Sequence, residues 1–224
     1  MWMWNRPRVT GHTRKTRGGS VLAEFSEDRR PSRWKLRTSL LASAVLGVAG
    51  MGMFAGSVSA APGDCSNPTI MGTPGPDMLE GTSGPDVIDA MGGDDVVNGR
   101  GGDDVICGRA GNDDIRGAGG NDTIRGGGGN DTIRGNDGND RVLGNDGNDR
   151  ILGGMGDDTL LGGMGDDNVS DAPDNDADSL SGGAGNDVLN SQDNDGSDSI
   201  DGGSGVNACT FDEGDSVNCG PQPI

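Results

Sequence analysis

A period of nine residues runs through most of this 224-residue chain and constrains its fold more than any other feature. An unbroken register of eleven copies extends from Gly72 to Ser170. In every copy the sixth position is Asp and the eighth is Leu, Ile or Val. A short, fixed period is typical of a solenoid, in which each repeat packs only against its neighbours. We therefore expect a stack of repeats rather than a globular core.

The repeats follow the pattern G-x-x-G-x-D-x-U-x, where U is aliphatic, in most copies. Positions seven to nine alternate outward, inward and outward, which predicts a three-residue strand with one buried side chain. Positions one to six are rich in Gly, Asn and Asp, the residues that favour tight turns. One repeat is then a turn and a short strand, and two repeats make an eighteen-residue coil. The predicted fold class is all-β, a parallel β-roll (solenoid) of nine-residue repeats with two repeats per coil.

The composition supports a thin core and a need for cations. Glycine accounts for 45 residues, and Phe211 is the one aromatic residue after Ala60. The same segment holds 7 Arg and no Lys against 33 acidic residues, a net charge of −26. A compact state with that charge repels itself unless positive ions are bound. The charge also excludes nucleic acid as a partner.

The repeated turns carry the chemistry of a hard-cation site. A tight Gly turn directs several backbone carbonyls to one side, and the Asp adds a carboxylate. Calcium prefers six to eight such oxygens, whereas magnesium keeps several waters that crowded carbonyls would displace. The sequence thus predicts multiple Ca²⁺ ions, with the position-six aspartates as metal ligands: Asp77, Asp86, Asp95, Asp104, Asp113, Asp122, Asp131, Asp140, Asp149, Asp158, Asp167, Asp178, Asp187 and Asp198. The fifteenth copy has Asn207 at this position.

These residues resemble the repeats-in-toxin (RTX) family, the haemolysin-type calcium-binding repeats, whose consensus is G-G-x-G-x-D-x-U-x. The copy from Gly126 to Arg134 matches every consensus position, as do those from Gly153 to Leu161 and from Gly182 to Asn190. The resemblance covers Gly72 to about Asp201 and implies a right-handed parallel β-roll that folds on calcium. Many copies lack the second Gly, a position that tolerates substitution. Family members often carry a lipase, protease or toxin domain, for which this chain has no room.

The first sixty residues predict an export signal. Arg33, Lys35 and Arg37 precede an apolar run from Leu40 to about Phe54, and Val58-Ser59-Ala60 forms a small-x-small cleavage site. We expect cleavage after Ala60 and a secreted, extracellular mature chain without a membrane span. The alternative is a membrane anchor, for which a run of about fifteen residues falls short of the roughly 20 that a spanning helix needs. Arg29-Arg30 is a weak twin-arginine candidate, and we favour the general secretory route.

Four regions follow from these boundaries. Residues 1–60 are the signal peptide with an extended basic n-region, 61–71 an N-terminal cap, 72–201 the calcium-binding β-roll, and 202–224 a C-terminal cap with a degenerate repeat. The four cysteines all follow Ala60, and an even count in an exported chain is typical of disulfides. Three pairings are open, of which proximity favours Cys65–Cys107 and Cys209–Cys219. Zinc is disfavoured because the chain has no C-x-x-C pair.

Two repeats are two residues longer than the others, 171–181 and 191–201. They are the twelfth and fourteenth, so their acidic turns should stack on one edge of the roll. The plain interpretation is a tolerated loop insertion. The alternative is an altered cation site or a partner contact.

The predicted function is that of an exported calcium-binding protein, a structural or interaction module outside the cell. An enzyme is not expected, because no His, Lys or Tyr follows Ala60 and a narrow rod offers no evident cleft. The alternative is a calcium-dependent adhesin or a mineral- or glycan-binding surface protein. A cell-surface or extracellular-matrix partner stays open.

Overall fold

The computed structural model of this chain describes residues 64–192 and 197–220. The described residues contain strands and turns but no helix, and so no helix long and apolar enough to cross a membrane. The predicted signal peptide, residues 1–60, and its cleavage site after Ala60 lie outside the described residues.

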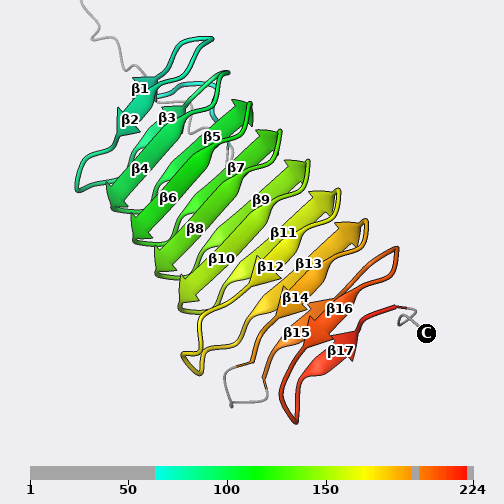
Figure 1. Ribbon diagram of the computed structural model, residues 1–224. Coiled ribbons are helices and arrows are strands. Elements are labelled where there is room, and N and C mark those ends of the chain that lie inside the picture. The colour runs from blue at the N-terminus through cyan, green and yellow to red at the C-terminus, as the bar shows by residue number, and fades with distance from the viewer. Residues whose placement is uncertain (1–63, 193–196, 221–224) are drawn as a thin grey trace, which may run out of the picture. The chain divides into compact units, whose positions relative to one another are not determined.

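The strands form two parallel sheets whose members alternate along the chain (Figure 1). The nine-stranded sheet contains β1 (Ile70–Met71), β3 (Val87–Asp89), β5 (Val105–Ala110), β7 (Thr123–Gly128), β9 (Arg141–Asp146), β11 (Thr159–Met164), β13 (Ser179–Ala184), β15 (Ser199–Asp201) and β17 (Ser216–Asn218). The eight-stranded sheet contains β2 (Met78–Glu80), β4 (Val96–Gly101), β6 (Asp114–Gly119), β8 (Thr132–Asp137), β10 (Arg150–Met155), β12 (Asn168–Ser170), β14 (Val188–Asn190) and β16 (Ala208–Thr210). The predicted all-β parallel β-roll with two repeats per coil is confirmed.

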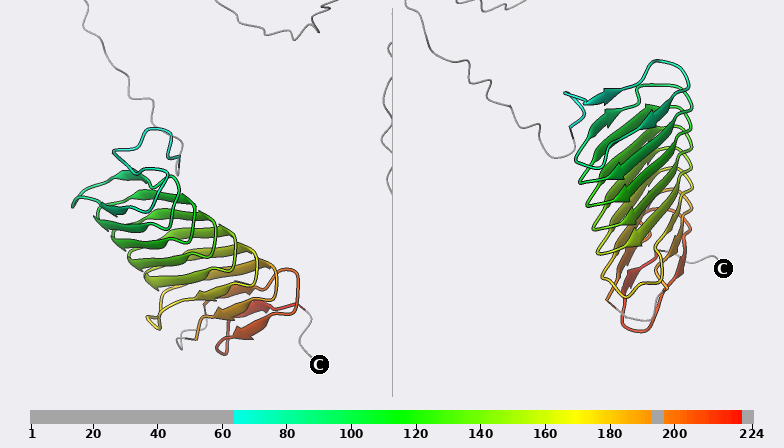
Figure 2. Two further views of the ribbon diagram at one scale, coloured as in Figure 1. Left: turned by 45° about the horizontal axis from the view of Figure 1, so that its top comes forward. Right: turned by 90° about the vertical axis from the view of Figure 1, so that its left-hand side faces the viewer.

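The register of the ladders follows the nine-residue period. Each strand from β1 to β10 pairs with the strand eighteen residues further on, as Ile133 pairs with Ile151. The offset becomes twenty where a long repeat intervenes, as between Leu160 and Leu180. The coils therefore stack one above another along a single axis, as the two further views in Figure 2 show.

Both long turns lead from the eight-stranded to the nine-stranded sheet, one before β13 and one before β15. Turns that connect the sheets in the same direction lie on the same edge of a roll. The prediction that the two acidic turns share one edge is therefore confirmed.

The core is a double row of position-eight side chains, one from each strand. Most are between 0 and 1% exposed: Ile88, Val97, Ile106, Ile115, Ile124, Ile133, Val142, Ile151, Leu160, Val169, Leu180, Leu189 and Ile200. Ile70, Leu79, Cys209 and Val217 pack against the row at its ends and are partly buried. A core one residue wide per strand explains how a chain almost without aromatic residues can fold.

Most central strands are longer than the three residues that the alternation predicted. Strands β4 to β11 and β13 each contain six residues, so positions one to three continue the ladder. Position two then adopts positive φ, even where it is not Gly: φ is 76° at Arg100 and 82° at Asn136. The alternation of outward and inward residues did not predict this extension, because the glycine at position one has no side chain with which to continue the pattern.

The roll also extends beyond residues 72–201 at both ends. Strand β1 precedes the first repeat, and β16 and β17 follow the last regular one, because Ile70, Cys209 and Val217 continue the inward row. Both predicted disulfides are present, Cys65–Cys107 with a Cα–Cα distance of 6.5 Å and Cys209–Cys219 with 6.2 Å. Each disulfide fastens one end of the roll.

Candidate metal centre

The position-six aspartates form two columns, one along each edge of the roll. Those that precede strands of the nine-stranded sheet form the nine-strand column: Asp86, Asp104, Asp122, Asp140, Asp158, Asp178 and Asp198. Those that precede the other sheet form the eight-strand column: Asp77, Asp95, Asp113, Asp131, Asp149, Asp167 and Asp187. Odd and even repeats thus supply opposite edges, and every predicted ligand belongs to one column or the other.

Hydrogen bonds connect each aspartate to the next in its column. The Oδ1 atom accepts the backbone N–H of the aspartate one coil earlier: Asp113 donates to Asp131, which donates to Asp149, both at 2.8 Å. The same contact runs along the nine-strand column, where Asp122 donates to Asp140 and Asp140 to Asp158. The carboxylates are therefore held rigidly and point into the turns, where they are between 1 and 3% exposed from Asp95 onward.

The second carboxylate oxygen, Oδ2, has no such partner in most of these residues. It is buried and accepts no hydrogen bond from the described part of the chain in Asp95, Asp104, Asp113, Asp122, Asp131, Asp140, Asp149, Asp158, Asp167, Asp178 and Asp187. A buried, ionised oxygen without a partner is costly, and native proteins rarely leave one. Its repetition at the same place in successive turns indicates a place suited to a positive group rather than a local packing fault.

The surroundings raise the pKa of these carboxyls. Burial is the largest cause, backbone hydrogen bonds oppose it, and neighbouring carboxylates add to it; the pKa rises to about 6 in Asp104 and to about 7 in Asp122, Asp131 and Asp167. At neutral pH the columns resist carrying their full charge. A divalent cation would remove that resistance, because its charge favours the ionised form.

The first aspartate of each column differs from the rest. The Oδ2 of Asp77 accepts hydrogen bonds from the backbone N–H and the hydroxyl of Thr73, and that of Asp86 accepts the same pair from Thr82. These bonds, above all the backbone N–H of Thr82, lower the pKa of Asp86. At these two turns, the threonine at position two therefore satisfies the Oδ2 atom with hydrogen bonds, whereas a cation would balance it in the other turns.

Asn207 ends the eight-strand column and shows what an unpartnered Oδ2 lacks. Its Oδ1 accepts the N–H of Asp187 at 2.8 Å, as an aspartate would. Its Nδ2 donates to the carbonyl oxygen of Gly202, the position-one residue of the same repeat, at 2.8 Å. In a regular repeat, position six presents Oδ2, a second acceptor, in place of this donor. The aspartate Oδ2 atom and the position-one carbonyl oxygen are both acceptors, so a cation between them could bind to both.

Other position-one residues point to the same place. A Cβ added to Gly126 would lie 2.3 Å from Asp131 Oδ2 and 2.9 Å from the carbonyl oxygen of Gly144, one coil on. Similar approaches recur at Gly117 and Gly135. Glycine at position one thus lets a carboxylate oxygen and a backbone carbonyl oxygen converge. All-oxygen sets of this kind suit calcium. The position-six carboxylates would hold the ions, and the ions would supply the charge that balances them.

The scan against family models agrees with this geometry. The RTX calcium-binding nonapeptide repeat matches in four copies, at residues 71–106, 108–142, 134–169 and 174–208, which together span more than half of the chain. The chain belongs to the RTX calcium-binding repeat family. Among curated proteins, a search for similar sequences finds no match.

The RTX repeats of this chain also contain functional residues that sequence reasoning missed. Position five carries Asn or Asp from Asp94 to Asp166, and in most of these copies its side-chain oxygen accepts the N–H of position five one coil later, as Asn112 does from Asn130 at 2.7 Å. Here the later coil donates to the earlier one, whereas at position six the earlier coil donates to the later one. The recurring N-D pairs of the sequence could have indicated these hydrogen bonds. Asp215 continues the nine-strand column, with Oδ1 3.3 Å from the N–H of Asp198. The D-x-V at 215–217 repeats the spacing of positions six and eight and could have predicted this role.

Proposed function

We propose that this protein is an exported calcium-binding module whose roll folds outside the cell when calcium enters the turns, and that it acts there as a structural or interaction element without catalytic activity. The observation that carries the proposal is the double column of buried carboxylates whose Oδ2 atoms accept no hydrogen bond from the described residues. Calcium binding to such a site is coupled to folding, because the site does not exist in the unfolded chain.

The charge of the roll explains why calcium would act as a switch. Without cations, the stacked carboxylates repel one another along each edge, and the thin aliphatic core has little to oppose that repulsion. Extracellular modules often bind calcium with dissociation constants of roughly 10⁻⁴–10⁻³ M. A chain with such affinities would stay unfolded where calcium is scarce and fold where it is abundant, which suits a protein that crosses a membrane before it folds.

Export is supported by two independent features. The two disulfides, Cys65–Cys107 and Cys209–Cys219, belong in an oxidising compartment. The basic and then apolar N-terminal segment, followed by Val58-Ser59-Ala60, has the order of a signal peptide. Sequencing the N-terminus of the protein recovered from the culture medium tests this: a start at Ala61 is expected, whereas retention of the apolar run in a membrane fraction would contradict it.

Calcium-dependent folding is tested on the chain from Ala61 to Ile224. Far-UV circular dichroism should change from a coil to a β spectrum as calcium rises through the millimolar range, and excess chelator should reverse the change. Magnesium at the same concentration is the control and should have little effect, since it retains its waters. An unchanged spectrum across the titration would contradict the proposal.

A further inference from the structure

The twelfth repeat replaces the position-one glycine with an acid. On the nine-strand edge, position one is Gly117, Gly135 and Gly153 in successive coils and then Asp171, eighteen residues after Gly153. The aspartate begins one of the two long repeats, 171–181, whose turn is rich in acidic residues. Asp171 is 7% exposed and its side chain lies inside the roll.

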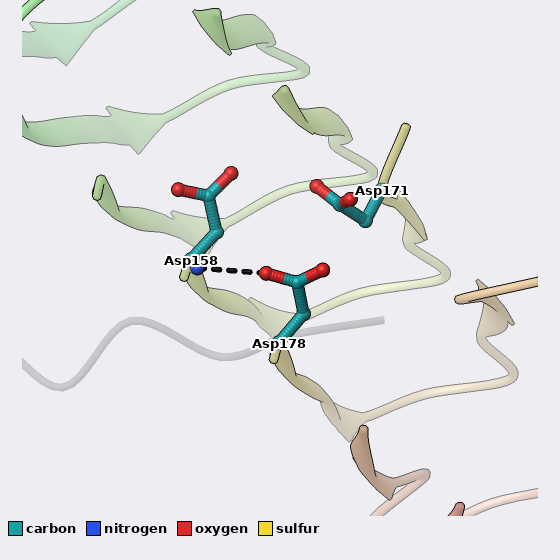
Figure 3. Close-up of side chains that lie close together, drawn as sticks. All are labelled: Asp158, Asp171 and Asp178. Atoms are coloured by element: carbon teal, nitrogen blue, oxygen red, sulfur yellow. Dashed lines mark hydrogen bonds between the residues drawn. The ribbon is translucent and has the colours of Figure 1, made fainter. Parts of the chain in front are cut away.

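Asp171 brings a third carboxylate to two column aspartates. One oxygen from each of Asp158, Asp171 and Asp178 lies within 4.8 Å of the others, and all three residues are buried. Figure 3 shows Asp158 and Asp178 on consecutive coils of one column, with Asp171 reaching toward them from a separate segment. Among the described residues, no regular turn groups three carboxylates in this way.

Hydrogen bonds fix one side of this cluster and leave the other open. Asp178 Oδ1 accepts the N–H of Asp158 at 2.7 Å, and Asp171 Oδ1 accepts the N–H of Gly154 at 3.0 Å. The Oδ2 atoms of all three residues are buried and accept no hydrogen bond from the described residues. Each carboxylate is thus oriented by the backbone, with a free oxygen inside the turn.

No basic side chain balances the cluster among the described residues, whose ion pairs all lie between Glu80 and Arg134 in the sequence. Burial raises the pKa of the Asp171 carboxyl and of the Asp178 carboxyl, and repulsion adds to it, from Asp158 in the first case and from Asp171 in the second. Three carboxylates at this separation can remain ionised together only beside a strong positive charge.

We propose that Asp158, Asp171 and Asp178 form a calcium site distinct from the regular turns, which binds its ion more tightly and before the other sites fill. The affinity of an oxygen site for calcium rises with the number of charged ligands and with its rigidity. This site has one carboxylate more than a regular turn, and all three are held by the roll. It lies where the register changes from eighteen to twenty residues, so its ion would fasten the long turn to the regular coils.

The inference rests on the proposed calcium binding by the repeats. Isothermal titration calorimetry of the full chain with CaCl₂ tests the three-carboxylate site separately from the regular sites. The unaltered chain should show one ion bound roughly tenfold or more tightly than the remaining class. Asp171→Asn should abolish the tight class and leave the weaker one. Asp171→Gly restores the regular repeat pattern and should have the same effect, which guards against a folding defect specific to the amide. Asp176→Asn removes an exposed charge from the same turn and is the matched control that should keep the tight ion.

The outcomes are distinct. A single affinity class in the unaltered chain, or a tight class that survives both substitutions at Asp171, would overturn the three-carboxylate site while leaving the calcium-binding roll intact. A chain that binds no calcium at all would overturn the proposed function as well. Terbium luminescence is an independent readout, since one slowly exchanging, water-poor ion should disappear with Asp171→Asn.

Discussion

Replacing Asp131 with Asn should shift the stability of the roll in opposite directions with and without calcium. Asp131 lies in the middle of the eight-strand column and is 2% exposed. Its Oδ1 accepts the N–H of Asp113 at 2.8 Å, whereas its Oδ2 accepts no hydrogen bond from the described residues. An amide keeps the first contact and turns the second atom into a donor. Asn207 already shows this arrangement, with its Nδ2 bonded to the position-one carbonyl oxygen.

The magnitudes follow from the carboxyl and from the ion. A pKa raised from 3.8 to about 7 corresponds to about 4 kcal/mol of ionisation cost well above that pH. Relaxation of the turn and entry of water reduce the cost, so we expect the metal-free roll to gain roughly 2–3 kcal/mol from the amide at pH 8. Calcium offsets this gain by about 1.4 kcal/mol at a tenfold excess over the dissociation constant of the lost site and by about 4.1 kcal/mol at a thousandfold excess, where the sign reverses.

Urea unfolding at pH 8, followed by far-UV circular dichroism, measures both effects. The metal-free arm contains chelator and sucrose, which favours the compact state of either protein. Asp137→Asn is the control, because it removes the same charge from an exposed side chain two residues after Gly135. If Asp131→Asn destabilises the roll by the same amount in both arms, Oδ2 is not the group that calcium balances, and the reasoning is refuted.

Three further results are expected. Gly129→Ala should destabilise the calcium-bound roll by roughly 1–3 kcal/mol, because φ is +126° there and a Cβ would lie 2.0 Å from a backbone oxygen. Gly128→Ala is the control and should be nearly neutral, because the atom nearest to its Cβ would be 3.9 Å away. Equal effects of the two substitutions in thermal unfolding would contradict the geometry. Ile133→Ala should cost roughly 2–5 kcal/mol in urea, since Ile133 is fully buried in a core one residue wide; a loss under 1 kcal/mol would mean that the coils collapse around the cavity. Stability of the metal-free roll should be greatest near pH 4 and fall as the pH rises to about 7, because the folded state holds protons that the unfolded chain has released. Circular dichroism in chelator checks this, and a β signal that grows with pH would have the wrong sign.

The sequence predicts the repeating part of this protein well, because one period specifies the strand, the buried residue and the turn at once. Ile133 and Asp131 could be assigned to the core and to the metal site from their spacing alone. The continuation of each strand through positions one to three could not be predicted in this way. Positive φ at residues such as Arg100 is imposed by the stacked coils, not by local preference.

The ends and the interruption of the array were harder to predict, because there a residue's role depends on its neighbour one coil away. Thr82 satisfies Asp86 through contacts that the nine-residue pattern does not encode. Asp171 has the composition of an exposed acidic loop and is buried only because it follows Gly153 by eighteen residues in the stack. Aligning the sequence by eighteen-residue coils as well as by nine-residue repeats places Asp171 at the same position as Gly153 and could have predicted its burial.

Hydrogen–deuterium exchange, read by mass spectrometry at pH 7.5 with and without calcium, tests the central claim most directly. The backbone N–H groups of the column aspartates donate to the carboxylates that calcium would balance, so their protection reports the sites themselves. The account predicts that protection of residues 95–190 appears on addition of calcium and is lost in chelator. Equal protection of these residues in chelator at that pH would show that the carboxylate columns fold without the ion, and would contradict it.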